Sequence, residues 1–342
     1  MEQKKNLLAP EELVFRRKFS IFAKTACKNL DMAIEATSLL RGEENREIPG
    51  VKEEIEHYDN IKATVITIFD KRGEELMGKK IGKYITVSIP SMGSKQDEIE
   101  KISSIVAQKL KMLFTFTKND TVLLIGLGNN NAIPDALGPK VVDATIATRH
   151  IKKYMPAEMD QNTISLCALA PGVLGETGIE TAEIIKGVVD HVKPSCIIVV
   201  DSLAAASIQR VGSTIQITDT GINPGSGMEG NKRMPISFDS MGVPVIALGV
   251  PTVVNTSFIL FETVNTLIEQ WQKEGYKQIP QVNSETIDKI SKKMLATFAG
   301  NLAVTPKVID ALVMEMATIL AAGIAQAVHP GVHRYNYHYY IK

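Results

Sequence analysis

Five short apolar runs alternate with amphipathic helical segments through the middle of this 342-residue chain. The runs are Thr121 to Leu127, Thr163 to Ala168, Cys196 to Val200, Thr214 to Ile217 and Val243 to Leu248. Continuous apolar strands are typical of a parallel sheet that helices cover on both faces. Between the second and third runs, residues 179–192 place apolar side chains on one helical face, which completes a βαβ unit. The pattern predicts an α/β fold with three layers, α/β/α, around a mostly parallel twisted sheet.

Smaller parts flank this core. Alternating β-branched residues predict paired strands in a smaller β-rich element, and amphipathic spacing predicts helices on both sides of the core strands. The expected bounds are about 50–95 for the β-rich element, 96–275 for the α/β core and 285–330 for the C-terminal helices. Helices are predicted near residues 96–114, 256–272, 287–298 and 306–328. Residues before about 50 are polar and mixed, so we interpret them as an appendage to the core.

The charge balance narrows the possible partners. Lys plus Arg and Asp plus Glu both number 38, so no net field draws the chain to nucleic acid or to an anionic membrane. We expect no signal peptide and no membrane span, which would need a run of ~20 apolar residues. The three cysteines show no C-x-x-C spacing, so we expect them to be reduced. The composition therefore favours a cytoplasmic protein.

Two acidic residues follow apolar runs, where ligands bind in open α/β sheets. Asp135 lies near the start of a predicted helix, whose N–H groups and dipole would keep its carboxylate ionised. Asp201 follows five apolar residues directly, and burial there would favour its neutral form. Two carboxylates with different proton affinities can act as general base and general acid on water. The alternatives are a helix cap for Asp135 and a buried acid satisfied by loop amides for Asp201.

Two glycine-rich loops are candidates for substrate contact. The backbone amides of the second loop could position a peptide or stabilise the oxyanion that forms when water attacks a carbonyl, and the alternative for this loop is a long surface turn. The expected substrate-binding residues are Gly126, Gly128 and Asn129 in the first loop, and Gly221, Gly225 and Gly227 in the second. The first loop does not match a dinucleotide-binding turn, because Asn131 stands where the third glycine belongs.

Other hydrolytic chemistries lack their motifs. The six histidines are scattered, no H-E-x-x-H occurs and no Cys/His metal spacing is present. A G-x-S-x-G turn is also absent, and no cysteine lies near a plausible histidine base. We therefore expect no metal ligands and no cofactor, and the carboxylate pair is the leading candidate.

Several long motifs resemble the spore germination protease family. They include GLGN and PDALGP within 126–139, TRH at 148–150, ALAPGVLGETGIETAEIIKGVV at 168–189, VVDSLA at 199–204, TDTGINPGSG at 218–227 and PVIALGVPTVV at 244–254. The resemblance covers about residues 50–331. It departs at Asn130, where the family usually has an aromatic residue, and the first forty residues match poorly.

The resemblance implies an endopeptidase that degrades small acid-soluble spore proteins during germination. It implies a fold similar to the hydrogenase maturation endopeptidases, with Asp135 and Asp201 as the proposed catalytic pair. It also implies a homotetramer in the cytoplasm of the developing forespore and the spore core, with no direct nucleic-acid or membrane partner. The open alternatives are a metal-dependent peptidase that uses the same aspartates and a non-catalytic relative that only binds peptide.

The same resemblance implies a zymogen that cuts itself near the N-terminus. The family prefers a bond after an acid and before a bulky apolar residue, followed by alanine and a further acid. The sequence Asp31-Met32-Ala33-Ile34-Glu35 has this pattern. We therefore predict self-cleavage between Asp31 and Met32, with residues 1–31 as the propeptide and 32–342 as the peptidase domain. The alternative is that the five residues are simply part of an amphipathic helix.

Overall fold

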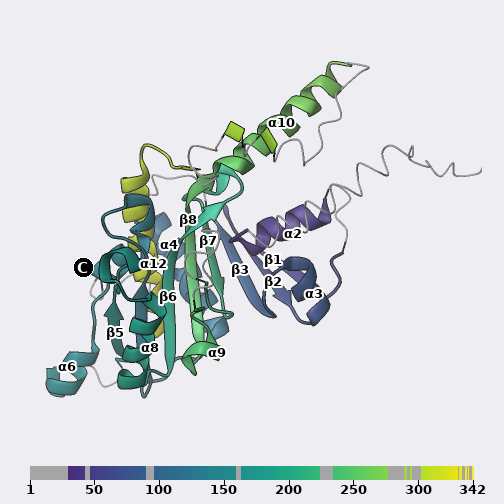
Figure 1. Ribbon diagram of the computed structural model, residues 1–342. Helices are drawn as coiled ribbons and strands as arrows, with labels where there is room; N and C mark the ends of the chain where they lie inside the picture. Colours follow the sequence, from purple (N-terminus) through teal and green to yellow (C-terminus); the bar gives the residue numbers. More distant parts are fainter. Residues whose placement is uncertain are drawn as a thin grey trace, which may run out of the picture.

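One nine-stranded sheet forms the centre of the computed structural model (Figure 1). The structure describes residues 30–42, 47–89, 96–158, 163–223, 234–275, 289–290, 293–294, 302–329, 331–332, 336, 338 and 341–342. The strands are β1 (Val51–Tyr58), β2 (Ile61–Ile68), β3 (Gly82–Ser88), β4 (Thr121–Gly126), β5 (Ser165–Leu169), β6 (Cys196–Ala205), β7 (Thr214–Thr218), β8 (Val245–Asn255) and β9 (Ala303–Val304). Their order is β1-β2-β3-β7-β8-β6-β4-β5, with β9 beside β8.

The sheet is mixed, which corrects the expectation of a mostly parallel one. Strands β5, β4, β6 and β8 are parallel neighbours, as the apolar runs predict. The other side of the sheet is antiparallel. Each neighbouring pair in the order β1, β2, β3, β7, β8 runs antiparallel, and β9 is also antiparallel to β8. Short links such as the one between β1 and β2 allow only antiparallel pairing, because a parallel pair needs a long crossover. The α/β class itself is confirmed.

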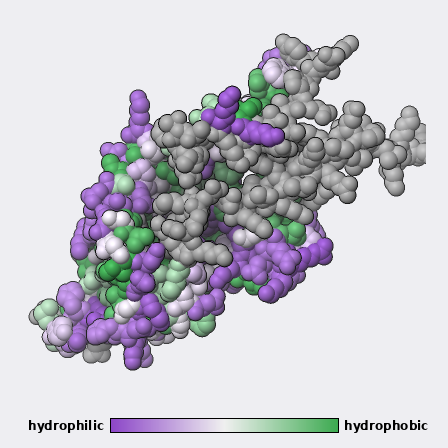
Figure 2. All heavy atoms as spheres, in the orientation of Figure 1, coloured by the Kyte–Doolittle hydropathy of each residue, from purple (hydrophilic) through white to green (hydrophobic). Residues whose placement is uncertain are grey.

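The predicted β-rich element is part of the same sheet. Strand β3 pairs with β7 from Tyr84 opposite Thr218 to Ser88 opposite Thr214. The element therefore extends the core sheet by three strands. Its outer strand β1 alternates partly buried and exposed residues, and Figure 2 shows hydrophilic side chains gathered over the region of β1 and α3. Exposed charges such as Lys52 and Glu54 discourage another strand from pairing with this edge.

Helices cover both faces of the sheet and complete the three layers (Figure 1). The longer ones are α2 (Ala33–Arg41), α4 (Gln96–Leu113), α5 (Leu137–Ala144), α8 (Thr181–Val192), α10 (Thr256–Lys273) and α12 (Ile309–Val328). The shorter ones are α3 (Lys71–Met77), α6 (Arg149–Tyr154), α7 (Leu174–Thr177) and α9 (Phe238–Met241). Helices α4, α5 and α12 share a core with one face of the sheet, whereas α8 and α9 pack on the other face beside α2 and α3. The predicted helix near 287–298 lies mostly outside the described residues.

Helix α12 is the apolar centre of the larger core. It is the one helix among the described residues that is long and apolar enough to cross a membrane, with a mean hydropathy of 1.8. However, 78% of its most apolar window is buried inside the protein. A β-carbon at Gly323 would lie 2.7 Å from Val106 on α4, so the two helices approach too closely for a larger residue. We therefore interpret α12 as a core helix, whose apolar surface is covered by α4 and α5.

Candidate active site

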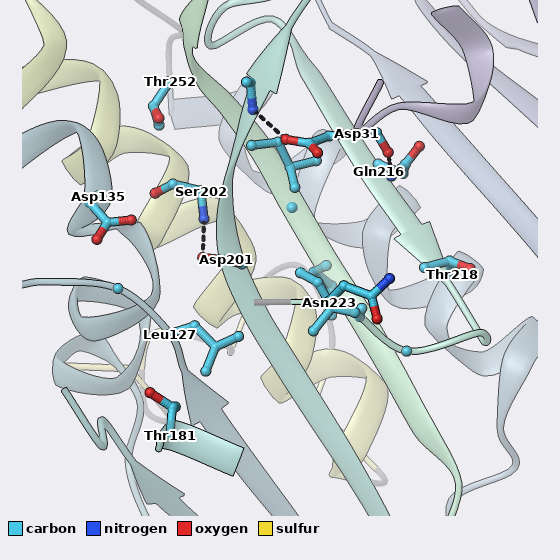
Figure 3. Close-up of a pocket in the computed structure, with 18 of the residues that line it drawn as sticks. Asp31, Leu127, Asp135, Thr181, Asp201, Ser202, Gln216, Thr218, Asn223 and Thr252 are labelled. Atoms are coloured by element: carbon cyan, nitrogen blue, oxygen red, sulfur yellow. Dashed lines mark hydrogen bonds between the residues drawn. The ribbon is translucent and has the colours of Figure 1, made fainter. Parts of the chain in front are cut away.

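A pocket of about 750 Å³ lies over the ends of the central strands (Figure 3). Its walls come from the loop after β4, the far part of β6, the segment leading into α7, the end of β7 and the segment before α2. Three aspartates line it, namely Asp31, Asp135 and Asp201. The fold thus brings both predicted catalytic residues to one cavity, as their positions after parallel strands suggest.

Asp135 ends a short 3₁₀ turn, Ile133–Asp135, that precedes α5. Its carboxylate accepts a hydrogen bond from the backbone N–H of Asn129 at 2.8 Å. Burial raises the pKa of Asp135, the Asn129 N–H opposes that rise, and the nearby carboxylate of Glu176 adds to it. The expected stabilisation by the N–H groups of the next helix is not observed, because the side chain bonds back to the loop and does not cap α5.

Asp201 lies within β6, opposite Gly249 of β8. It was expected at the end of the strand, but β6 continues four residues further to Ala205. Its carboxylate accepts a hydrogen bond from the N–H of Ser202 at 2.9 Å. Burial raises the pKa of Asp201 well above its usual value, and the carboxylates of Asp135 and Asp31 raise it further. Burial and the neighbouring carboxylates therefore both shift Asp201 in the direction of its neutral form.

The surroundings of Asp135 and Asp201 shift the two pKa values by different amounts, as general acid–base catalysis requires. Both pKa values are raised, but that of Asp201 is raised much further. Asp135 also keeps a backbone donor that favours its ionised form. Because the two groups interact, they titrate as a pair in which one proton is held mainly by Asp201. Such a pair has one group able to accept a proton and one able to donate.

The glycines of the first loop serve close packing. A β-carbon on Gly126 would meet the carbonyl oxygen of Gly138 at 2.1 Å, and one on Gly128 would meet that of Asp135 at 1.9 Å. Gly128 also has a φ of +113°, which side chains rarely adopt. Gly128 and Asn129 line the pocket, whereas Gly126 is buried in β4 and is not among the lining residues. The loop is therefore shaped to hold Asp135 against the end of β4.

The second glycine loop is described only in part. Gly221 lines the pocket with a φ of +78°, and its neighbour Ile222 forms a two-way backbone bridge with Ile236. The expected substrate contacts Gly225 and Gly227 lie outside the described residues. For the described part, the structure therefore brings one of the three predicted glycines to the pocket.

The predicted cut site lies inside the pocket. The carboxylate of Asp31 accepts a hydrogen bond from the N–H of Ala204 at 2.8 Å, and Met32 is fully buried. Further along, Glu35 accepts a hydrogen bond from the N–H of Ala206 at 2.9 Å. The segment from Asp31 to Glu35 thus lies along the extended part of β6, close to Asp201. The helical alternative is also partly right, since α2 begins at Ala33.

Three residues that the sequence analysis did not single out contact this segment. Gln216 and Lys79 reach its backbone, and Arg210 lies 3.5 Å from the Glu35 carboxylate. Gln216 interrupts the apolar strand TIQIT, and a buried amide in a central strand is a signal for a polar partner. Lys79 and Arg210 carry no comparable signal, because nothing in their local sequence distinguishes them from surface cations.

Among the described residues, no group of three or more His, Cys, Asp or Glu side chains is arranged to hold a metal ion. The groups that the pocket offers for a reaction are carboxylates, backbone amides and the ammonium of Lys79. An α/β fold with two aspartates in one pocket, beside a short segment of the same chain, is the arrangement expected of a peptidase.

Comparisons with known proteins agree with that class. A family profile described as germination protease, peptidase A25, matches residues 26–286 and 277–341. A germination protease of Caldanaerobacter subterraneus subsp. tengcongensis is 44% identical over 309 residues, covering 88% of this chain and 94% of that protein. Those of Clostridium tetani and Bacillus cereus are 40% and 36% identical, covering 88% and 90% of this chain and 95% of each relative. The chain belongs to the germination protease family and is an endopeptidase.

Among solved structures, a [NiFe] hydrogenase maturation protease, HycI, from Thermococcus kodakarensis is similar to this chain. The identity is 16% and the TM-score is 0.27, and the match covers 56% of this chain and 96% of the other. At that score the likeness adds nothing to the argument about the site.

Proposed function

We propose that this chain degrades small acid-soluble spore proteins when a spore germinates, and that it is made as a zymogen that cuts itself between Asp31 and Met32. The family membership supports the germination context. The observation that carries the proposal is the shared pocket, in which Asp135 and Asp201 lie beside the segment that contains the cut site.

In this proposal the two aspartates divide the proton transfers. Asp135, whose ionised form is favoured by the Asn129 N–H, takes a proton from water as the water attacks the peptide carbonyl. Burial beside two other carboxylates favours the neutral form of Asp201, and in this form Asp201 gives its proton to the leaving amine. Each transfer contributes ~10²–10⁴-fold to the rate in enzymes of this kind.

The docked segment also indicates which substrates would fit. The Ala204 N–H would donate to an acidic side chain just before the cleaved bond, and the apolar residue just after the bond would be buried, as Met32 is. The Ala206 N–H and Arg210 would bind a second acidic side chain at the position of Glu35. These contacts suit the acid-apolar-alanine pattern that the chain itself carries around Asp31. A substrate protein with the same pattern would bind in the same way.

The proposal includes a homotetramer that works in the cytoplasm of the forespore and spore core, with spore proteins as its partners and no cofactor. It is tested with the full chain and a purified small acid-soluble spore protein. After self-processing, fragments that end in an acid and begin with an apolar residue support the proposal. An intact spore protein, with the processed enzyme folded and its new N-terminus at Met32, would instead indicate a relative that only binds peptide.

A further inference from the structure

The carbonyl oxygen of Asp31 accepts hydrogen bonds from two side chains at once. The ammonium of Lys79 lies 3.2 Å away and the Nε2 amide of Gln216 lies 3.1 Å away. Lys79 also donates to the neighbouring carbonyl of Leu30 at 2.7 Å. This carbonyl of Asp31 belongs to the bond between Asp31 and Met32, which is the proposed cut site. The group that would be attacked is therefore held by one cation and one amide donor.

The orientation of Gln216 follows from its partners. Its Oε1 accepts the N–H of Ala33 at 2.7 Å, and a backbone N–H can only donate. Nε2 must then face the carbonyl of Asp31, which can only accept. The one amide thus spans the Asp31–Met32 bond, from the carbonyl before it to the N–H of the second residue after it.

Gln216 and Lys79 are held in place by different parts of the fold. Gln216 lies in the middle of β7 between Thr86 of β3 and Gly249 of β8, and it is 7% exposed. Lys79 follows Gly78, which ends α3 with a φ of +63° and turns the chain toward the pocket. Side chains placed by a central strand and a helix end need little rearrangement during a reaction, which is what stabilisation of developing charge requires.

We propose that Lys79 and Gln216 are catalytic residues that stabilise the oxyanion formed at the carbonyl of Asp31. The oxygen of water bonds to the carbonyl carbon and gives a proton to Asp135, and the π electrons of the C=O bond move to the oxygen that the two donors hold. When the oxyanion collapses, the C–N bond to Met32 breaks and the nitrogen takes the proton of Asp201. Asp135 then returns its proton to Asp201.

This inference rests on the proposed self-cleavage and adds the groups that carry its negative charge. The expectation that the second glycine loop supplies those groups stays a prediction, because most of that loop lies outside the described residues. Loss of one oxyanion donor lowers the rate of an enzyme by about 10²–10³-fold. The alternative is that the two side chains only tie the segment down.

The test measures the first-order rate of self-processing of the full chain in four variants. Lys79→Met and Gln216→Glu are each expected to slow processing by about 100-fold or more, and Gln216→Met to slow it by a similar factor. Lys79→Arg keeps the positive charge and is expected to recover most of the rate. Gln216→Glu is decisive because it retains an acceptor for the Ala33 N–H but places a carboxylate beside the carbonyl. If Gln216 acts only through its tie to the Ala33 N–H, this variant would process almost normally.

Two matched controls alter the same residue types outside the pocket. Lys71→Met changes an exposed lysine at the start of α3, and Gln270→Met changes an exposed glutamine on α10. Both are expected to process at the unaltered rate. Circular dichroism melts on all variants show whether each is folded.

Docking of the segment is followed separately by amide hydrogen exchange at Ala204, whose N–H is bonded to the Asp31 side chain. This measurement uses each variant in a chain that also carries Asp201→Asn, so that the bond stays intact. Slow processing with Ala204 still protected supports the proposal. Processing within about threefold of normal, or slow processing with that protection lost, overturns it. Mass spectrometry maps the new N-terminus, and a cut elsewhere than before Met32 overturns the proposed self-cleavage together with this inference.

Discussion

The backbone N–H of Ala204 donates to the carboxylate of Asp31 at 2.8 Å, three residues beyond Asp201 on the same strand. The register between β6 and β8 shifts between Leu203 and Ala204, and this irregularity gives Ala204 a partner outside the regular ladder. The segment that begins at Asp31 is therefore held by the strand that carries one of the proposed catalytic residues. In the proposed zymogen, this segment occupies the place of a substrate.

We predict that self-processing is intramolecular. Because Asp31 lies in the pocket of its own chain, the first-order rate constant should not change over a 100-fold range of protein concentration. The measurement is a time course of the new N-terminus by mass spectrometry. A rate proportional to concentration would show that one chain cuts another and that the docked segment is not the reacting one.

Replacing either proposed catalytic residue should stop self-processing. Asp135→Asn cannot accept the proton of water, and Asp201→Asn cannot give one to the amine, so each change should lower the rate by ~10²–10⁴-fold. Asp190→Asn is the control, since that residue is exposed on α8 and pairs with Lys186. Near-normal processing by a folded Asp135→Asn or Asp201→Asn chain would remove that residue from the pair.

Glu35 should make the full chain less stable as pH rises. Burial raises the pKa of Glu35 from 4.5 to about 7, against the Ala206 N–H and the charge of Arg210. A carboxyl that holds its proton more tightly when folded contributes its full stability below pH 4.5 and loses it as pH rises through about 7. The loss is at most ~3 kcal/mol, from the difference between the two pKa values.

Urea unfolding at pH 5 and pH 8 measures this effect. Glu35→Gln keeps an acceptor for the Ala206 N–H but cannot ionise, so it should reduce the fall in the free energy of unfolding between the two pH values. Glu75→Gln, an exposed change on α3, should leave the fall unchanged. An unchanged fall in Glu35→Gln would mean that Glu35 does not couple to folding.

Gly128→Ala should disrupt the loop that holds Asp135. The added carbon would lie 1.9 Å from the Asp135 carbonyl oxygen, at a φ of +113°. We expect a loss of ~2–3 kcal/mol in the free energy of unfolding and slower processing. Gly187→Ala is the matched control, because it meets nothing within 4 Å on α8 and should raise stability by up to ~1 kcal/mol. Equal stability of the two variants would contradict the packing role of Gly128.

The carboxylate mechanism predicts that the processed enzyme stays active after exhaustive chelation. The measurement is cleavage of a peptide with the Asp31–Glu35 sequence before and after dialysis against a strong chelator. Activity that disappears and returns with a divalent ion would favour the metal-dependent alternative, in which the same two aspartates hold the ion.

The sequence predicted the part of the fold that depends on local pattern. Continuous apolar runs indicated the parallel strands, and the convergence of their ends brought Asp135 and Asp201 together. The extension of β6 to Ala205 was missed, because residues after Asp201 lack the apolar character of a buried strand. The mixed sheet was missed because the pairing of β3 with β7 joins segments far apart in the chain.

The site was predicted at its aspartates but not at its other donors. Asp135 and Asp201 could be placed because each follows an apolar run, whereas Lys79 reaches the pocket only because α3 and β3 lie beside β7. The motif around Asp31 suggested a cut site, yet its docking depends on hydrogen bonds to residues more than 170 positions away. Such contacts come from the tertiary structure and leave no periodic pattern in the sequence.

If the chain cuts itself as proposed, the anchoring of α2 affects the enzyme afterwards. Ala33 and Ala36 are buried against β2, β3 and α3, and this packing does not involve the bond before Met32. Hydrolysis would therefore release the preceding residues but leave Met32 in the site as a new chain end. The newly processed enzyme would then carry a product of its own cleavage in the active site, where this product competes with substrate. Spore proteins would be cleaved only after a lag, during which the new N-terminus at Met32 is displaced.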